Sequence, residues 1–363
     1  PKYLWIKIMA YSSIVKPTDY FNTVTYSGNG SSTQAITGVG HQPDWVWIKS
    51  RSNTENHMLS DVVRGSTKRL RSDTTNAEDD LGSNGIQSFD TDGFTAGDGD
   101  AMNASGQTYV AWNWKAGGSA SSNGNGSITS SVSANTTAGF SIVSFTGTGS
   151  NATVGHGLGA APAWVTVKKR VGTGDATLRD WNVYHGSLGN TKRMILNLNH
   201  AVSTSSEYWN DTSPTSSVVT LGTNDQVNGN NNTYIMYAFA EIKGYSKFGS
   251  YKGNGNADGP FVHTGFKPAF VMTKRSNNTE NWYILDNERS PFNPPLNALA
   301  PNLSNAEDTS ATGRIQDFLS NGFKLRTSDT AVNGSGDTYI FMAFAENPFV
   351  GNDSGTAVPV TAR

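Results

Sequence analysis

Apolar and polar positions along this chain follow one pattern that occurs three times. In each occurrence an aromatic residue precedes a Gly-x-Gly turn, and a proline follows 17 positions after that aromatic residue. The prolines are Pro43, Pro162 and Pro268, and each is followed by an aromatic residue, a valine and a lysine at the second, third and sixth positions. A fixed internal spacing is the mark of a repeated structural unit. The sequence therefore predicts three copies of one module.

Each copy also ends on a short apolar run that follows a polar, asparagine-containing loop. The runs begin at Tyr109, Tyr234 and Tyr339 and are rich in aromatic residues. Runs of about six apolar residues between turn residues are typical of strands that are buried on both faces. We therefore expect each copy to open and close with a strand, and the middle sections, which vary in length, to contain loops.

The repeated spacing also sets the expected boundaries. They are an N-terminal lead (1–19), a first copy (20–118), a linker (119–138), a second copy (139–244), a third copy (245–350) and a C-terminal tail (351–363). Small polar residues dominate the linker, although residues 127–133 could add an edge strand. The second and third copies are joined with almost no slack, which predicts rigid packing between them. Met9 resembles a natural start, so residues 1–8 are expected to be an upstream extension.

Composition points to many short strands and frequent turns. The chain of 363 residues has 39 glycines, and 15% of its residues are charged. About seven short strands per copy predict an all-β fold of three tandem antiparallel β-sandwich repeats, of the jelly-roll or lectin-like kind. The balance of 27 basic and 29 acidic residues argues against a nucleic-acid partner. No apolar run approaches the ~20 residues that span a bilayer, so no membrane insertion is expected.

Catalytic chemistry finds little support in the sequence. The chain has no cysteine, which excludes disulfides and thiolate sites. Close acidic clusters occur at 78–80, 90–92 and 98–100 in glycine-rich loops, where turn positions are favoured and a loop calcium site is the alternative. The six histidines show no metal-ligand spacing, so loop or turn positions are expected for them. We therefore expect no enzyme activity, no metal site and no cofactor.

The repeated lysines allow two interpretations. Lys49, Lys168 and Lys274 share a strand face with the repeated aromatic residue, so they could form a functional row. The favoured interpretation is that each lysine marks the point where its strand leaves the core and the ammonium group reaches water.

Aromatic residues are the better candidates for ligand binding, because an aromatic ring beside polar groups can stack on a sugar ring. Five of them lie in the variable middle sections among polar neighbours and could form a receptor surface: Trp181, Tyr184, Tyr208, Trp209 and Trp282. A place in the core is the favoured alternative for Trp181 and Trp282. The aromatic residues that hold one place in every copy are expected in the core: Trp45, Trp114, Trp164, Phe239, Phe270 and Phe344.

Several stretches of the second copy together resemble a repeat found in virion proteins of marine tailed bacteriophages. They are Gly155-His-Gly-Leu-Gly-Ala-Ala-Pro-Ala-Trp164 and residues 180–185, 228–234 and 239–251, and the resemblance covers nearly the whole chain from Met9. It implies an appendage subunit, such as a tail-fibre-like protein, with concanavalin-like lectin sandwiches. No catalytic or ligand residue is carried over, since none is defined on these motifs.

The resemblance implies a subunit that is made in the host cytoplasm and is located on the virion surface. There it would assemble with itself, as a homotrimer, and with other virion proteins, and its loops would bind a host-surface glycan or receptor. Two alternatives of other classes are a glycan-degrading tailspike enzyme and a purely architectural subunit of a head decoration or filament. An enzyme would show two facing carboxylates in an aromatic cleft, whereas an architectural subunit would bury the variable loops between chains.

Overall fold

The computed structural model describes residues 12–171, 179–310 and 312–348. In this part of the chain the fold is all-β, with short helices only, and its sheets are built from antiparallel pairs. The all-β prediction is therefore confirmed. The expected start at Met9 and the predicted C-terminal tail lie outside the described residues.

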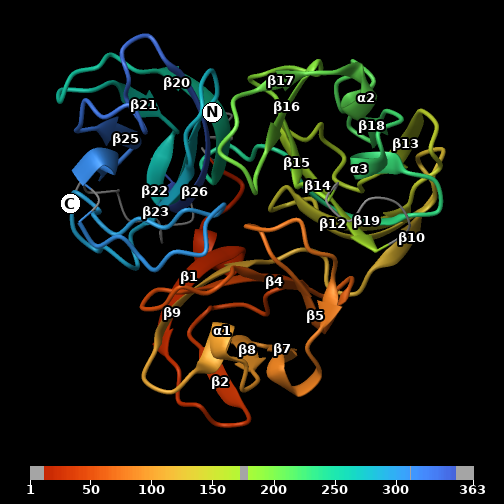
Figure 1. Ribbon diagram of the computed structural model, residues 1–363, viewed down its shortest axis with the longest axis horizontal. Coiled ribbons are helices and arrows are strands. Elements are labelled where there is room, and N and C mark those ends of the chain that lie inside the picture. Colours follow the sequence, from red (N-terminus) through yellow and green to blue (C-terminus); the bar gives the residue numbers. More distant parts are fainter. Residues whose placement is uncertain (1–11, 172–178, 311, 349–363) are drawn as a thin grey trace, which may run out of the picture.

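Three lobes surround a common centre in Figure 1, and each is formed by one part of the chain. We call these parts segment one (residues 20–118), segment two (139–244) and segment three (245–348). Each segment contributes a larger and a smaller sheet. Four strands of the larger sheet follow the same order in every segment: the opening strand, the closing strand, the strand at the repeated proline and the strand after it.

Segment one has a six-stranded sheet in the order β1, β9, β3, β4, β5, β6 and a three-stranded sheet in the order β2, β8, β7. The bounds are β1 (Phe21–Ser27), β2 (Gln34–Thr37), β3 (Trp45–Ser50), β4 (Met58–Asp61), β5 (Gly65–Leu70), β6 (Asp79–Asp80), β7 (Ile86–Asp90), β8 (Gly93–Ala96) and β9 (Thr108–Trp114). Its helical turns are η1 (Pro17–Asp19), just before the segment, η2 (Gly82–Asn84) and α1 (Asp100–Asn103).

Segment two lies in an eight-stranded sheet in the order β10, β11, β12, β19, β14, β15, β16, β17 and a two-stranded sheet of β13 and β18. The bounds are β10 (Ser121–Asn123), β11 (Ser130–Asn135), β12 (Phe140–Thr146), β13 (Ala152–Gly155), β14 (Trp164–Val171), β15 (Asn182–His185), β16 (Lys192–Ile195), β17 (Ser203–Thr204), β18 (Val218–Leu221) and β19 (Thr233–Phe239). Its helices are α2 (Ser206–Trp209) and α3 (Asp225–Asn228).

Segment three has a four-stranded sheet in the order β20, β26, β22, β23 and a three-stranded sheet in the order β21, β25, β24. The bounds are β20 (Ser246–Lys252), β21 (Phe261–His263), β22 (Phe266–Arg275), β23 (Trp282–Asp286), β24 (Gln316–Leu319), β25 (Gly322–Leu325) and β26 (Thr338–Pro348), and the helical turn is η3 (Thr312–Arg314).

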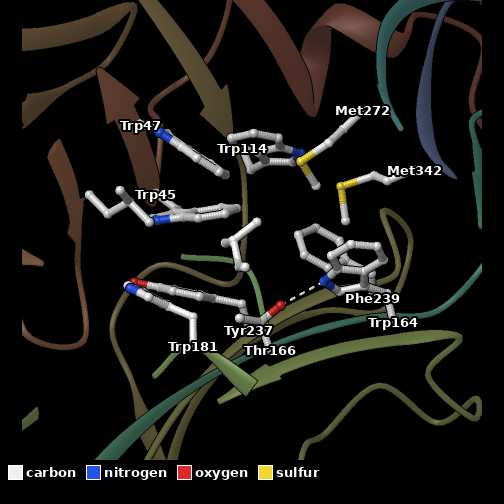
Figure 2. Close-up of a pocket in the computed structure, with 12 residues that line it drawn as sticks. Trp45, Trp47, Trp114, Trp164, Thr166, Trp181, Tyr237, Phe239, Met272 and Met342 are labelled. Carbon is white, nitrogen blue, oxygen red and sulfur yellow. Dashed lines mark hydrogen bonds between the residues drawn. The ribbon is translucent and has the colours of Figure 1, made fainter. Parts of the chain in front are cut away.

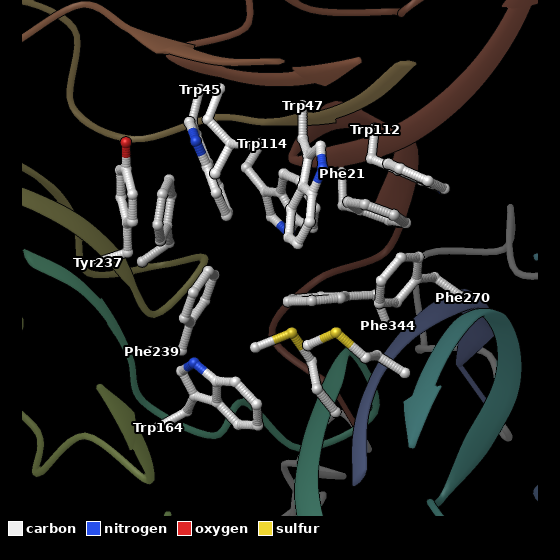
Figure 3. Packing of buried hydrophobic residues seen from close by; sticks show 14 of the residues in the cluster. Phe21, Trp45, Trp47, Trp112, Trp114, Trp164, Tyr237, Phe239, Phe270 and Phe344 are labelled. Carbon is white, nitrogen blue, oxygen red and sulfur yellow. The ribbon is translucent and has the colours of Figure 1, made fainter. Parts of the chain in front are cut away.

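Both faces of each larger sheet are buried, and they serve different cores. In β3, Val46 and Ile48 point into the apolar core of segment one, whereas Trp45 and Trp47 point the other way. The side chains on this second face of all three larger sheets meet in one central cluster, which Figure 3 shows. The repeated aromatic residues are therefore buried as predicted, but in a core that the three segments share.

The predicted linker is folded. Part of it forms β10 and β11, which extend the larger sheet of segment two, and Ile128 and Val132 are buried in the local core of that segment. The edge strand that residues 127–133 could add is present in part as β11, although β10 and not β11 lies at the edge of the sheet. Small side chains suffice here, because β12 supplies the hydrogen-bond partner for β11 and two apolar residues cover the sheet.

Candidate functional site

The three segments begin and end at the same place. Phe21, at the start of β1, stacks on Phe344 near the end of β26, with ring centroids 4.9 Å apart. Phe239, at the end of β19, lies 5.8 Å from Phe344, and Phe140, at the start of β12, stacks on Phe239 at 4.5 Å. Aromatic pairs at such distances stabilise beyond the area they bury. The chain therefore closes into a ring around this cluster (Figure 3).

The centre of the ring is packed with side chains. A cavity of about 20 Å³ lies between aromatic, leucine and methionine side chains from all three segments (Figure 2). This volume suits about one water molecule. Two of its lining residues satisfy each other, since the Trp164 indole donates to the Thr166 hydroxyl at 2.7 Å. The centre is thus a structural core rather than a ligand site.

One position on each larger sheet makes a polar contact to the next segment. It lies opposite the repeated aromatic residue and holds Asp61, His185 or Asp286. Asp61 accepts from the Tyr237 hydroxyl of segment two at 2.7 Å, and Asp286 accepts from the Trp112 indole of segment one at 2.9 Å. His185 Nε2 lies 3.3 Å from the carbonyl oxygen of Phe341 in segment three. The contacts run from segment one to segment two, from segment two to segment three and from segment three to segment one.

The junction of segments one and two contains a buried ion network. Arg64 pairs with Asp61 at 2.5 Å and with Glu78 at 3.3 Å, and Glu78 pairs with Arg170 of segment two at 2.8 Å. Burial alone would lower the pKa of Arg64, but Asp61, Tyr237 and Glu78 outweigh burial and raise that pKa above its ordinary value. The guanidinium group is therefore held charged between its partners.

The junction of segments three and one repeats this network. Arg289 pairs with Asp286 at 2.7 Å and with Glu307 at 2.9 Å, and Glu307 pairs with Arg51 of segment one at 2.8 Å. Glu78 and Glu307 hold the same place in the sequence Asn-Ala-Glu-Asp, which occurs in both segments. The motif occurs in segments one and three, and at each of the two junctions its glutamate is the carboxylate that two arginines share.

The junction of segments two and three has the same backbone contact without the ions. Val202 N–H donates to the carbonyl oxygen of Ser276 at 2.7 Å, as Glu78 N–H does to Arg170 at 3.1 Å. Val202 thus stands where the other junctions have glutamate, and Ser276 where they have arginine. Leu188, three residues after His185, packs with Val202 against the central cluster. This junction is held by apolar contacts and an imidazole.

Two buried histidines contact segment three from its neighbours. His57 Nδ1 accepts from the Trp47 indole at 2.8 Å, and His57 Nε2 lies 3.1 Å from the carbonyl oxygen of Ala300. His185 Nδ1 accepts from Ser187 N–H at 3.1 Å. Burial lowers the pKa of His57 to about 3 and that of His185 to about 4. Both rings are neutral near pH 7. His57 lies in the loop just before β4, as predicted, whereas His185 ends β15 and His263 ends β21, so the prediction of loop or turn positions is wrong for these two.

The five aromatic residues that could form a receptor surface are inside the protein. None is more than 5% exposed: Trp181, Tyr184, Tyr208, Trp209 and Trp282. Trp181 and Trp282 belong to the central cluster, where their indoles donate to the carbonyls of Arg71 and Ile195 on neighbouring segments at 2.6 and 3.0 Å. The other three belong to the local core of segment two. These residues form no exposed receptor surface, because parts of the chain distant in sequence cover them.

The repeated lysines are buried, which corrects the prediction that they reach water. Lys49, Lys168 and Lys274 are each 0% exposed. Their ammonium groups donate to backbone carbonyls: Lys49 to Ser50 at 2.6 Å, and Lys168 to Thr74 of segment one at 3.2 Å. Burial lowers the pKa of Lys49 and Lys274 to about 8 and that of Lys168 to about 7. The carbonyls replace water as acceptors, which makes burial of the ammonium group tolerable.

The acidic clusters serve turns and ion pairs. Asp92 accepts from Gly38 N–H and Gly40 N–H at 3.0 and 2.6 Å, and Asp79 pairs with Arg69 and Arg71 at 2.6 and 2.8 Å. Within residues 12–171, 179–310 and 312–348, no three histidine, aspartate or glutamate side chains are grouped to hold a metal ion. The helices of this same part of the chain are too short or too polar to cross a bilayer.

Sequence reasoning missed a latch at the Gly-x-Gly turn of each segment. The latch residues Asn103, Asn228 and Asn333 are 0% exposed. Their side-chain oxygens accept from the backbone N–H inside the turn, at Asn29, Thr148 and Asn254, at 2.9, 2.9 and 2.8 Å. Each latch residue stands six positions before the tyrosine that begins a closing run, and this constant spacing is the signal that could have found it.

A surface hollow of about 190 Å³ opens on segment three. It lies between Tyr283 on β23, the stretch 298–308 and Arg314, with Leu303 36% exposed. Arg314 lies over the Tyr283 ring at 4.4 Å, and it donates to Asp308 at 3.1 Å and to the Tyr283 hydroxyl at 3.2 Å. This hollow combines apolar wall residues with the charged pair of Asp308 and Arg314, whereas a larger hollow of about 340 Å³ beside Phe145 in segment two is lined mainly by serine and threonine.

The fold and its junctions define an all-β protein in which three segments share one core. The chain belongs to a family described as a domain of unknown function (DUF7483), whose model matches residues 16–348. The match spans all three segments, so the family corresponds to the whole ring. Among curated proteins none matches the chain.

Proposed function

We propose that this chain is a structural subunit of a tailed-phage particle, in a tail-fibre-like appendage at the virion surface, where it contacts a host-surface glycan or receptor. The sequence resemblance suggests this setting. The observation that carries the proposal is the ring itself, because three segments fixed around one core, without disulfides, form a rigid block. A rigid block suits an appendage that must hold loops in a constant arrangement outside the cell.

The finer fold is part of the same proposal. The three segments are three tandem β-sandwich repeats of the lectin-like type, that is, one module used three times. Support comes from the common strand order of the larger sheets and from the latches and backbone contacts that recur at equivalent positions. Superposition of the three segments in an experimental structure tests this, and segments that fail to superimpose would contradict it.

Self-assembly and attachment to other virion proteins also belong to the proposal, with a homotrimer as the expected state. Segment three offers the contact surface. In the described residues the two exposed large aromatic side chains, Phe261 and Phe292, are 43% and 77% exposed, and both lie in this segment. Asn293, next to Phe292, pairs with the backbone of Phe318 at 2.8 and 2.9 Å and fixes the loop. Light scattering of the purified chain tests the trimer.

Particle labelling tests the proposed setting. Antibodies raised against the purified chain should decorate one appendage of intact particles of the encoding phage in electron micrographs, and mass spectrometry of those particles should detect the chain. Absence of the chain from purified particles would overturn the proposal.

A purely architectural subunit is the second candidate, because the five aromatic residues nominated for ligand contact are all buried. Competition separates the two candidates. A receptor-binding subunit, added as the purified chain, should compete with intact particles for the host-surface glycan, whereas an architectural subunit would not compete. The tailspike enzyme stays a third candidate, which product analysis after incubation with host-surface glycan tests directly.

A further inference from the structure

The hollow on segment three exists because this segment departs from the other two after β23. In segments one and two, β4 and β15 are followed by the return strands β5 and β16, which continue the larger sheet. In segment three the larger sheet ends at β23, and only isolated bridges at Leu299 and Ala298 follow. This stretch contains Pro291, Pro294, Pro295 and Pro301. Proline has no N–H to donate and cannot continue a strand ladder, so pairing along this side of β23 is reduced to the bridge between Ile284 and Leu299.

Arginines of the return strands make the corresponding contacts in the other segments. In segment one, Arg69 of β5 pairs with Asp79 at 2.6 Å, and Asp79 is the counterpart of Asp308 in the repeated motif. In segment two, Arg193 of β16 lies over the Tyr208 ring at 3.9 Å. In segment three Ala298 stands at this place, bridged to Asp308 as Arg69 is to Asp79, and it brings no charged group. Asp308 pairs instead with Arg314 from η3, and the hollow remains between them.

The chemistry of the hollow suits an uncharged, polyhydroxylated ring. Leu303, 36% exposed in its wall, can contact the C–H face of such a ring, and Asn305 is exposed at its rim. Asp308 and Arg314 form an ion pair at 3.1 Å, and the Tyr283 hydroxyl donates to Glu280 at 2.9 Å, so the charged groups here already have partners. Carboxylate, guanidinium and amide groups together offer both acceptors and donors for hydroxyl groups.

The volume limits the size of the ligand. Sites for drug-sized molecules measure roughly 300–1,000 Å³, and the hollow of about 190 Å³ is smaller. It therefore has room for one six-membered sugar ring rather than for a chain of several.

We infer that the hollow between Tyr283, Leu303 and Arg314 binds one neutral pyranose ring, at an end or branch of a glycan. This inference rests on the proposed contact with a host-surface glycan and gives it a site. Single rings held by few polar contacts bind weakly, so a dissociation constant on the order of 1 mM is expected for a free sugar. Several subunits on one appendage would raise the avidity.

The test uses the full chain and methyl glycosides of glucose, galactose and mannose, with binding followed by ligand-observed NMR. Ala306→Phe fills the hollow and should weaken binding of the preferred glycoside at least about tenfold. Asn305→Ala, on the exposed rim, should weaken binding about fivefold through a lost hydrogen bond. The same repeated motif supplies matched controls in segment one, Ala77→Phe and Asn76→Ala, which should bind as the wild type does.

The outcomes separate this site from the proposed function. Equal weakening by Ala306→Phe and Ala77→Phe would overturn the site while leaving glycan recognition standing elsewhere on the chain. If no methyl glycoside binds the wild type, the inference is overturned, and particle labelling still decides the virion setting independently. If Ala306→Phe fails to fold, the comparison of Asn305→Ala with Asn76→Ala decides, since both side chains are exposed.

Discussion

The junction of segments one and two and the junction of segments two and three share one backbone contact but hold different side chains around it. The first buries Arg64, Glu78 and Arg170 in an ion network, whereas the second has Leu188, Val202 and Ser276 at the same places. The chain connects both pairs of segments by a short stretch, from Trp114 to Ser121 and from Phe239 to Ser246, so the connection alone does not explain the difference.

One ion network lies between segments three and one, which stand at opposite ends of the sequence and have no short connection. The other lies between segments one and two, although β9 ends at Trp114 and β10 begins at Ser121 in the sheet of segment two. Buried ion pairs contribute little net stability compared with apolar packing, but an unmatched partner is costly. We interpret the two networks as devices that select the correct neighbour.

The largest expected effect comes from removing the shared carboxylate. Glu307→Ala leaves Arg51 without its carboxylate and Arg289 with Asp286 alone, and should lower the free energy of unfolding by about 3–5 kcal/mol; Glu78→Ala should do the same at its junction. Val202→Ala, at the equivalent place, should cost about 1 kcal/mol. Urea unfolding of the three variants measures this. Equal losses in all three would show that the junctions do not differ.

Acid should weaken the junctions of segment three. The pKa of His185 is about 4 in the folded chain, below the ordinary 6.5, because burial disfavours the charged ring. The unfolded state therefore binds more protons between these values, and stability should fall as pH drops from about 6.5 to 4, by about 3 kcal/mol for this group. His185→Leu should flatten the decline of the unfolding midpoint over that range. A variant with the same pH profile as the wild type would contradict the role given to the imidazole.

The turn latches provide a smaller effect that should be equal in the three segments. Asn103→Ala, Asn228→Ala and Asn333→Ala each remove the buried side-chain amide that pairs with the backbone of the turn, which should cost about 1–3 kcal/mol. Thermal unfolding measures the three losses side by side. A loss confined to one segment would show that the segments are equivalent in strand order but not in energetics.

The sequence predicts which strands are buried better than it predicts which distant parts of the chain cover them. The spacing from aromatic residue to proline identifies the opening, proline and closing strands, because a sheet with two covered faces needs apolar residues at every position. It does not show that Trp45 faces a core shared by three segments, since periodicity carries no information about which distant surface lies opposite. Trp181 stands in a polar stretch of the sequence. The carbonyl that accepts from its indole belongs to Arg71, which is far away in sequence, so the local pattern does not show that contact.

The charged junction residues could be predicted in part. Asp-x-x-Arg occurs at 61–64 and at 286–289, and Arg51 and Arg170 each stand two positions after a repeated lysine. These recurrences indicate that the charged residues hold equivalent positions in different segments. Their partners across the junctions lie more than 90 residues away, so spacing alone could not pair them.

Closure of the ring between segments three and one is tested most directly by chemical cross-linking. The chain contains no cysteine, so Thr25→Cys with Glu288→Cys introduces the only two thiols. The wild-type side chains, in segments one and three, lie 3.4 Å apart. A short bis-maleimide should join the two cysteines within one chain, with a yield that does not depend on protein concentration. No cross-link, or cross-links only between chains, would contradict a ring closed within a single chain.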